Sequence, residues 1–250
     1  MTIGRSAPAG LSSGSRGLWG GGGGAATGAD SWTTHIEYLT ISTTGNSVDF
    51  GELTGSGESI AACSSVTRGL WMGRANPTVR DTIDYVTIAT LGDAVDFGDL
   101  SVARNMGGAC SDMTRGVYGG GDGNLNTIDY VTIATPGNAT DFGDLTVGRN
   151  HCGSCSDHIK GLWGAGYSPN SNVIDYITIA TPGNAADFGN LTVARRNTGA
   201  CSDGTKGLWG GAVGGDSNVI DYVTIATLGD AVDFGDLSVG RNIRQGITGD

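Results

Sequence analysis

The chain has 250 residues, of which 46 are glycine and 16% are charged, and its 25 acidic and 14 basic residues give a formal net charge of −11. An acidic surface repels nucleic-acid phosphates and anionic membranes at long range, so the charge disfavours both as partners. The sequence also has no apolar run of about 18 residues and no apolar N-terminal leader, so we expect neither membrane insertion nor a secretory signal.

An internal repeat accounts for almost the whole chain. The triplet Asp-Phe-Gly begins at residues 49, 96, 141, 187 and 233, so successive copies start 47, 45, 46 and 46 residues apart. In protein kinases this triplet holds catalytic magnesium, but an active site needs it once, and the other kinase motifs are missing here. A fixed period of this length indicates a repeat architecture instead.

Each repeat contains four segments of strand length. In the third repeat the predicted strands span 106–112, 115–120, 128–134 and 140–147. Segments such as "IDYVTIA" are apolar on both faces, as expected for a strand packed between two sheets. The Pro-Gly pair in "TPGN" at 135–138 predicts a type II turn before the fourth strand. Four strands at this period, without helical periodicity, are typical of a propeller blade.

The predicted fold is therefore all-β, a five-bladed β-propeller with four-stranded antiparallel blades, in one domain covering residues 1–250. The repeats span approximately 5–57, 58–104, 105–149, 150–195 and 196–241. Residues 242–250 form a duplicate inner-strand segment, because Arg241 and Ile247 occupy the repeat slots of Arg5 and Leu11. We expect one terminal copy to complete the blade that holds residues 16–55, and the sequence leaves open which terminus supplies it.

The order of these features resembles kelch-type repeats. The sequence "RRNTGACSDGTKGLWGG" precedes "NVIDYVTIATLGDAVDFGDLSVGR", as kelch repeats place an arginine and an inner strand before an aromatic strand, a tyrosine strand and an outer strand. The fourth strand departs from the kelch pattern by having Phe where Trp is usual. The near-identical units also resemble the glycine-rich, kelch-like repeat proteins of marine tailed phages, which are described as tail-fibre or virion structural proteins. This resemblance covers essentially the whole chain and implies a virion protein that is assembled in the host cytoplasm.

Two sets of residues recur in fixed slots and are expected to be structural. Neighbouring sheets pack about 10 Å apart, too far for a disulfide, so the repeated cysteines should be buried free thiols. They are Cys63, Cys110, Cys155 and Cys201. The aromatic residues of the second strand should pack between blades. They are Trp19, Trp71, Tyr118, Trp163 and Trp209.

Metal binding is disfavoured by the same repetition. Cys152 and Cys155 form a C-x-x-C motif beside His151 and His158, but no second cysteine pair exists, so zinc is not predicted. The carboxylates that recur in the third strand allow calcium as a weaker alternative, although repeated aspartates more often accept backbone N–H bonds. They are Glu37, Asp84, Asp129, Asp175 and Asp221. We therefore predict no cofactor.

The repeats differ mainly in the connections between the second and third strands and between the fourth strand and the next repeat. In an up-and-down blade these two connections emerge on the same face, and variable loops on a uniform scaffold are typical of binding surfaces, although neutral drift explains them equally. The candidate binding residues in the divergent loops are Trp32, His35, Arg74, Arg80, Asp122 and Tyr167. No catalytic triad, phosphate loop or unique carboxylate pair is evident, so we predict no enzyme.

The predicted function is that of a non-enzymatic phage virion structural or adhesion protein. The propeller would sit on a tail fibre, tail or capsid and present its loops to a host surface or to other virion proteins, as part of an oligomeric particle. The expected partners are other virion proteins and a host cell-surface glycan. The alternative is a carbohydrate-binding protein, because five near-identical blades also resemble tachylectin-type lectins with sites between blades. A glycan-degrading enzyme would need an acidic residue in one blade only, and none can be identified.

Overall fold

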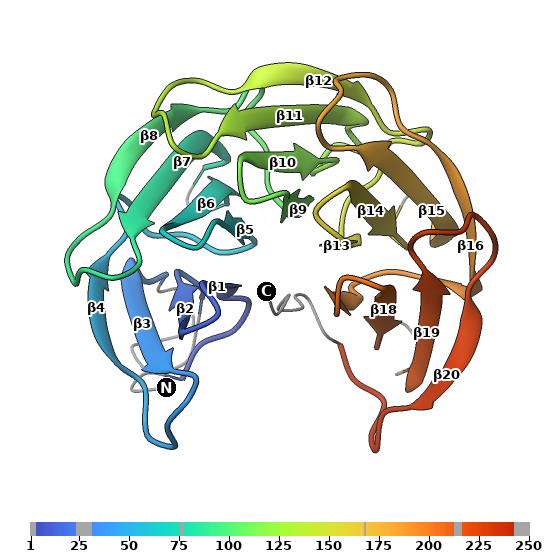
Figure 1. The fold of residues 1–250 in the computed structure, drawn as a ribbon, viewed down its shortest axis with the longest axis horizontal. Helices are drawn as coiled ribbons and strands as arrows, with labels where there is room; N and C mark the ends of the chain where they lie inside the picture. Colours follow the sequence, from blue (N-terminus) through green and yellow to red (C-terminus); the bar gives the residue numbers. More distant parts are fainter. Residues whose placement is uncertain (1–3, 24–31, 76–77, 168, 213–216, 243–250) are drawn as a thin grey trace.

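The computed structural model describes residues 4–23, 32–75, 78–167, 169–212 and 217–242. These residues form twenty strands and no helix, and the strands make five sheets of four antiparallel strands each. Figure 1 shows the sheets radiating from a common centre as the blades of a five-bladed β-propeller. The predicted fold class is confirmed.

Each blade is one uninterrupted run of four strands, so blade 1 is β1 to β4 and blade 5 is β17 to β20. The innermost strands are β1 (Ala9–Ser12), β5 (Ala61–Ser64), β9 (Gly108–Ser111), β13 (Gly153–Ser156) and β17 (Gly199–Ser202). The second strands are β2 (Arg16–Gly20), β6 (Arg68–Arg74), β10 (Arg115–Gly119), β14 (Lys160–Gly164) and β18 (Lys206–Gly210). The third strands are β3 (His35–Thr40), β7 (Arg80–Thr87), β11 (Thr127–Thr132), β15 (Ser171–Thr178) and β19 (Val219–Thr224). The outermost strands are β4 (Val48–Glu52), β8 (Val95–Asp99), β12 (Thr140–Asp144), β16 (Ala186–Arg195) and β20 (Val232–Asp236).

The N-terminal copy of the duplicated segment completes blade 1, because β1 pairs with β2 in the register Leu11 opposite Leu18. Of the C-terminal copy at 242–250, all but Asn242 lies outside the described residues. The predicted turn at 135–138 is wrong in detail. The turn bond lies three residues earlier, from the N–H of Thr135 to the carbonyl of Thr132 at 3.0 Å, and Gly137 is not among the glycines with positive φ.

The Asp-Phe-Gly triplet is a β-bulge in the outermost strand. In blade 3, Ile128 faces Gly143 and Asp129 faces Asp141, so Phe142 is the extra residue of the bulge. The Asp141 carboxylate accepts a hydrogen bond from the N–H of Gly143, which has a φ of 141°. A Cβ on Gly143 would lie 2.5 Å from the carbonyl oxygen of Gly183 in the next blade, so only glycine fits.

Apolar cores lie between successive blades. The indole of Trp163 donates to the carbonyl of Gly108 in the preceding blade at 2.9 Å, and Trp71 and Trp209 make the equivalent bonds. Tyr118 takes this slot in blade 3, where burial raises its pKa to about 12. The packing role predicted for the aromatic slot is confirmed for these four residues, which are at most 2% exposed.

The cysteine slot is also part of these interfaces. No disulfide joins these cysteines, and the predicted burial is confirmed for Cys63, Cys110 and Cys155, whereas Cys201 is half-buried. A Cβ on Gly161 of blade 4 would lie 2.6 Å from the sulfur of Cys110, so the glycines of the second strand leave room for the thiols of the preceding blade.

The blade interfaces differ at the two ends of the series. Phe234 is 54% exposed, while its four counterparts are each 3% exposed. Trp19, which was predicted to pack between blades, is only half-buried. Both residues lie on blade faces that no neighbouring blade covers.

Every blade contains a buried ion pair between an arginine and the carboxylate of its third strand. In blade 3 the guanidinium of Arg104 lies 2.8 Å from Asp129, and both side chains are at most 1% exposed. The hydroxyl of Ser101, at the end of blade 2, donates to the same carboxylate at 2.7 Å. The pair thus joins the start of one blade, its own third strand and the end of the preceding blade.

Asp129→Ala tests this pair, with Asp233→Ala as the matched control. Removing the Asp129 carboxylate leaves Arg104 buried without a counter-charge, so we expect the free energy of unfolding to fall by about 3–5 kcal/mol. Asp233 is exposed and accepts only the local bond from Gly235 at 2.9 Å, so its loss should cost about 0.5–1.5 kcal/mol. Urea denaturation measures both, and equal losses would contradict the role given to Asp129.

Candidate functional site

The connections that vary among repeats lie together on one face of the propeller. In blade 4, Asn150 of the entry connection forms an isolated β-bridge with Tyr167 of the loop between the second and third strands. Glu58 and Ala75 form the same bridge in blade 2. We call this surface the loop face. The opposite face carries the turns between the third and fourth strands, which are near-identical in blades 2 to 5, and three-residue turns between the first and second strands, which vary in sequence.

Five residues at equivalent positions, one from each blade, surround the centre of the loop face. We call them the hub residues: Ala7, Ser59, Met106, His151 and Asn197. All five have a positive φ between 51° and 60°, a conformation that costs non-glycine residues roughly 1–3 kcal/mol. The N–H of Met106, His151 and Asn197 each donates to the carbonyl of the preceding hub residue, at 3.0, 2.7 and 3.0 Å. The surrounding ring therefore imposes this backbone, while the side chains differ in every blade.

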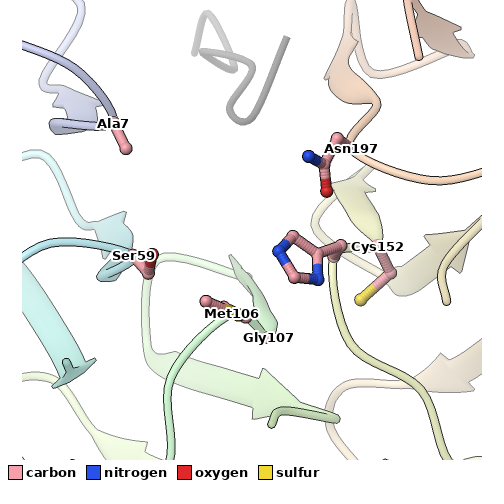
Figure 2. A pocket seen from close by; sticks show the side chains of 7 residues that line it. Ala7, Ser59, Met106, Gly107, Cys152 and Asn197 are labelled. Carbon is pink, nitrogen blue, oxygen red and sulfur yellow. The ribbon is translucent and has the colours of Figure 1, made fainter. Parts of the chain in front are cut away.

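The hub residues line a pocket together with Gly107 and Cys152 (Figure 2). Asn197 is 6% exposed, and its side-chain oxygen is buried without a hydrogen-bond partner, as is the hydroxyl of the adjacent Thr198. Burial raises the pKa of the Cys152 thiol to about 11, although Arg149 acts in the opposite direction. The pocket thus combines an unsatisfied amide with a thiol that stays protonated at neutral pH.

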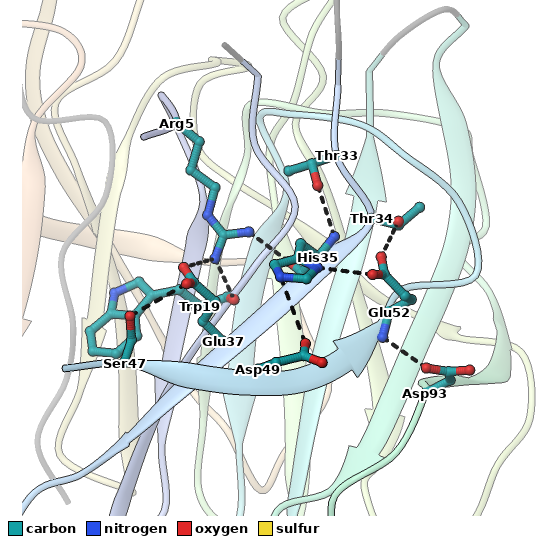
Figure 3. Close-up of polar contacts among 10 residues, drawn as sticks. All are labelled: Arg5, Trp19, Thr33, Thr34, His35, Glu37, Ser47, Asp49, Glu52 and Asp93. Atoms are coloured by element: carbon teal, nitrogen blue, oxygen red, sulfur yellow. Dashed lines mark hydrogen bonds and ion pairs between the residues drawn. The ribbon is translucent and has the colours of Figure 1, made fainter. Parts of the chain in front are cut away.

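Two of the predicted binding residues, Trp32 and His35, belong to blade 1. Trp32 is half-buried and forms an isolated bridge with Gly23. The Nδ1 atom of His35 lies 2.9 Å from Glu52, and its Nε2 atom lies 3.7 Å from Asp49 (Figure 3). Burial favours the neutral form of Glu52, but hydrogen bonds from Thr34 and His35 outweigh it and hold the pKa of Glu52 below its usual value. His35 therefore links carboxylates of the outermost strand.

Arg74 is a buried, structural residue and does not belong to the exposed loops. It lies in β6, is 6% exposed and pairs with Asp84 at 3.0 Å. Blade 2 has Gly57 where the other blades have their entry arginine, and a Cβ on Gly57 would lie 3.1 Å from the side chain of Arg74. Arg74 thus delivers the missing guanidinium from another strand, and we remove it from the candidate binding residues.

Arg80, Asp122 and Tyr167 lie on the loop face in blades 2, 3 and 4. Arg80 and Asp122 are exposed, and the backbone N–H of Asp122 donates to the carbonyl of Asn105. Tyr167 is 44% exposed, and the guanidinium carbon of Arg196 stacks 4.2 Å from its ring centroid. The structure therefore spreads the predicted residues over four blades and does not gather them into one pocket.

The repeated carboxylates of the third strands each bind an arginine, which occupies the oxygens that calcium would need. Burial raises the pKa of Asp175 even though Arg149 lowers it, and burial lowers the pKa of Arg195 despite Asp221. Cys155 packs in the core between blades 4 and 5, while Cys152 lines the hub pocket. Within the described ranges no three His, Cys, Asp or Glu side chains form a cluster suited to a metal ion.

The hub residues were missed as candidates from the sequence. Aligning the repeats places Ala7, Ser59, Met106, His151 and Asn197 in one column, two residues after the entry arginine or, in blade 2, after Gly57. The columns on either side vary as well, so the alignment does not set apart this column. Its meaning depends on the positive φ and the central position, which only the structure supplies.

No protein-family model matches the chain, and a search of curated proteins found no significant match. Within the part of the chain that the structure describes, no helix has the length and apolarity to cross a bilayer. The functional interpretation therefore depends on the geometry of the chain itself.

Thiol labelling tests the placement of the cysteines. The thiolate is the reactive form, and burial raises the pKa of Cys110, Cys152, Cys155 and Cys201, so accessibility is what distinguishes them. Cys201 is half-buried, so at pH 7.5 we expect a maleimide to modify it at least about tenfold faster than the other three. Peptide mass spectrometry measures each rate, and labelling in denaturant is the control. Equally fast labelling of Cys152 would instead indicate an open, reactive hub pocket.

Proposed function

We propose that the chain is a non-enzymatic binding module of a phage virion, a structural or adhesion protein that uses the loop face to contact a host surface or another virion protein. One observation carries this proposal. The longest connections that differ between otherwise near-identical blades lie on the loop face, around the hub, while the repeated residues form the blade interfaces. A scaffold that keeps its backbone constant and changes side chains on one face has the organisation of a recognition surface.

The hub strengthens this interpretation because its backbone is costly. Non-glycine residues with positive φ persist where the surrounding structure dictates them, and such positions cluster at functional sites. Glycine would relieve the strain at the hub, yet none of the five repeats has glycine there. Side chains at the hub therefore have a use that offsets the strain.

Tyr167 and Arg196 provide a recognition feature on the loop face. A half-exposed tyrosine with a guanidinium on its ring offers an apolar face, a hydroxyl and a cation together. Such aromatic and arginine groups dominate the binding energy of many interfaces. They also suit glycans, since sugar rings present C–H faces and hydroxyl groups.

The assignment to a virion rests on the sequence resemblance to phage repeat proteins. Free cysteines agree with assembly in a reducing cytoplasm. Mass spectrometry of purified particles tests this part of the proposal, and absence of the chain from particles of the phage that encodes it would contradict it.

A lectin is the second candidate, supported by a shallow pocket on the opposite face. Tyr130, Pro136 and Asn138 line it in blade 3, and blade 4 repeats these residues as Tyr176, Pro182 and Asn184. Repeated pockets predict several equal, weak sites that act through avidity. Saturable monosaccharide binding near five sites per chain would favour the lectin over a single loop-face site.

Tyr167→Ala tests the loop face, with Leu91→Ala on the opposite face as the matched control. Tyr167 and Leu91 are exposed to similar extents, 44% and 52%, so neither change should alter the melting temperature much. We expect Tyr167→Ala to weaken binding to host cells or to an arrayed glycan about tenfold, the effect of losing an aromatic anchor. Reduced binding by Leu91→Ala, with Tyr167→Ala unchanged, would contradict the loop-face proposal and favour the lectin.

A further inference from the structure

The outer face of blade 5 lacks the cover that each of the other blades receives from its successor. Phe234 stacks edge-on against Tyr222 with ring centroids 5.7 Å apart, as its counterparts do in the other blades. Those counterparts are buried by the next blade, whereas Phe234 is 54% exposed. A Cβ on Gly235 would meet no atom within 4 Å, although one on the equivalent Gly189 would lie 2.3 Å from the Gly229 carbonyl oxygen.

The facing surface of blade 1 is open in the same way. Trp19 is half-buried, while the equivalent Trp71, Trp163 and Trp209 are at most 2% exposed. Figure 1 shows blades 1 and 5 at the two ends of an arc, where they do not meet.

The four existing interfaces define what a blade needs from the next blade. The N–H of a turn glycine donates to the carbonyl of the preceding phenylalanine, as Gly229 does to Phe188 at 2.9 Å. The cation at the start of the second strand donates to an isoleucine carbonyl of the next blade, as Lys160 does to Ile225 at 3.1 Å. The corresponding groups of blade 5 are the Phe234 carbonyl and Lys206. Among the described residues Lys206 contacts only aromatic rings through its Nζ atom, 4.7 Å from Tyr222 and 5.9 Å from Phe234.

Arg241 shows that blade 1 is not the missing neighbour. It follows blade 5 in the slot of Arg195, which pairs with Asp221 in the third strand of the next blade at 3.0 Å. Arg241 is exposed, and among the described residues its side chain hydrogen-bonds only to the Val239 carbonyl, at 3.4 Å. The equivalent carboxylate of blade 1, Glu37, is already paired with Arg5 at 3.0 Å. A neighbour that completes this interface must therefore bring its own buried carboxylate.

We infer that the space between blades 5 and 1 is a docking site for one further four-stranded blade of the same repeat type, donated by a partner protein. The incoming blade would offer a turn-glycine N–H to Phe234, an isoleucine carbonyl to Lys206 and an aspartate to Arg241. Its other face would receive Trp19. Continuity with the four existing interfaces fixes this chemistry, and a partner that lacks the aspartate would leave Arg241 without a counter-charge.

An added repeat in the full chain tests the fit of such a blade. A second copy of residues 196–241, inserted after Arg241, places Trp209 and Asp221 of the copy against blade 5. Hydrogen exchange measured by mass spectrometry should show fast exchange at 44–47 in the natural chain, and slow exchange there in the extended chain, as slow as at 91–94. The melting temperature should rise by roughly 5 °C or more, since each kcal/mol shifts it by about 2–4 °C in a chain of this size.

The matched control is the same insertion carrying Asp221→Ala in the added copy, which should lose most of the gain in melting temperature. Fast exchange at 44–47 in the extended chain would overturn the inference. Slow exchange there in the natural monomer would mean that the ring closes on itself, and slow exchange with a multiple of the monomer mass would mean that copies associate. Either result would also overturn it.

Phe234→Asp in the natural chain gives an independent test that needs no added repeat. On an uncovered face it should change the melting temperature by less than about 2 °C, whereas Phe188→Asp, which buries a charge between blades 4 and 5, should prevent folding or lower it by more than about 10 °C. Comparable losses for the two variants would show that the face of blade 5 is already covered and would overturn the inference.

Discussion

A buried guanidinium beside a buried carboxylate organises each blade. Removing both charges from water costs several kcal/mol per ion, and the attraction between them repays this only with good geometry and further hydrogen bonds. Here the carboxylate of Asp129 also accepts from Ser101 of the preceding blade, and the guanidinium of Arg104 donates to the Tyr118 carbonyl. The pair therefore fixes where one blade starts relative to the preceding blade. It constrains the position of the blade more than it stabilises the fold.

Blade 2 shows that the position of the charge is what the fold requires. Its entry connection has Gly57 instead of arginine, and Arg74 supplies the guanidinium from the second strand. Arg74 also donates to Gly55 and Thr54 of the connection that lacks the arginine. The chain thus keeps the ion pair through a different backbone route. Such a substitution in space is invisible in an alignment of repeats, where Arg74 looks like a loop residue free to bind a ligand.

The fold was predictable because the repeat itself gives the number, order and type of the strands. The roles of single residues were harder to predict. The Asp-Phe-Gly triplet was predicted only as part of the fourth strand, and it forms a bulge because Gly143 must approach the next blade closely. The type II turn predicted from the Pro-Gly pair does not form, because tertiary contacts decide φ at Gly137. The hub could not be found because convergence of five separated positions is a property of the ring.

The ends of the series differ from one another, and this difference has a physical meaning. Terminal units of repeat proteins are usually atypical, because they must tolerate an uncovered face. Blade 1 is atypical at its interface positions: it has Leu11 for cysteine, Glu37 for aspartate and Ser47 for alanine. Blade 5 keeps the residues of an internal blade, among them Cys201 and Phe234. Blade 5 thus exposes a face whose residues are those of a covered blade, as expected of a face that binds a neighbour. The asymmetry therefore assigns the specific docking contacts to blade 5, while blade 1 has residues that tolerate an uncovered face.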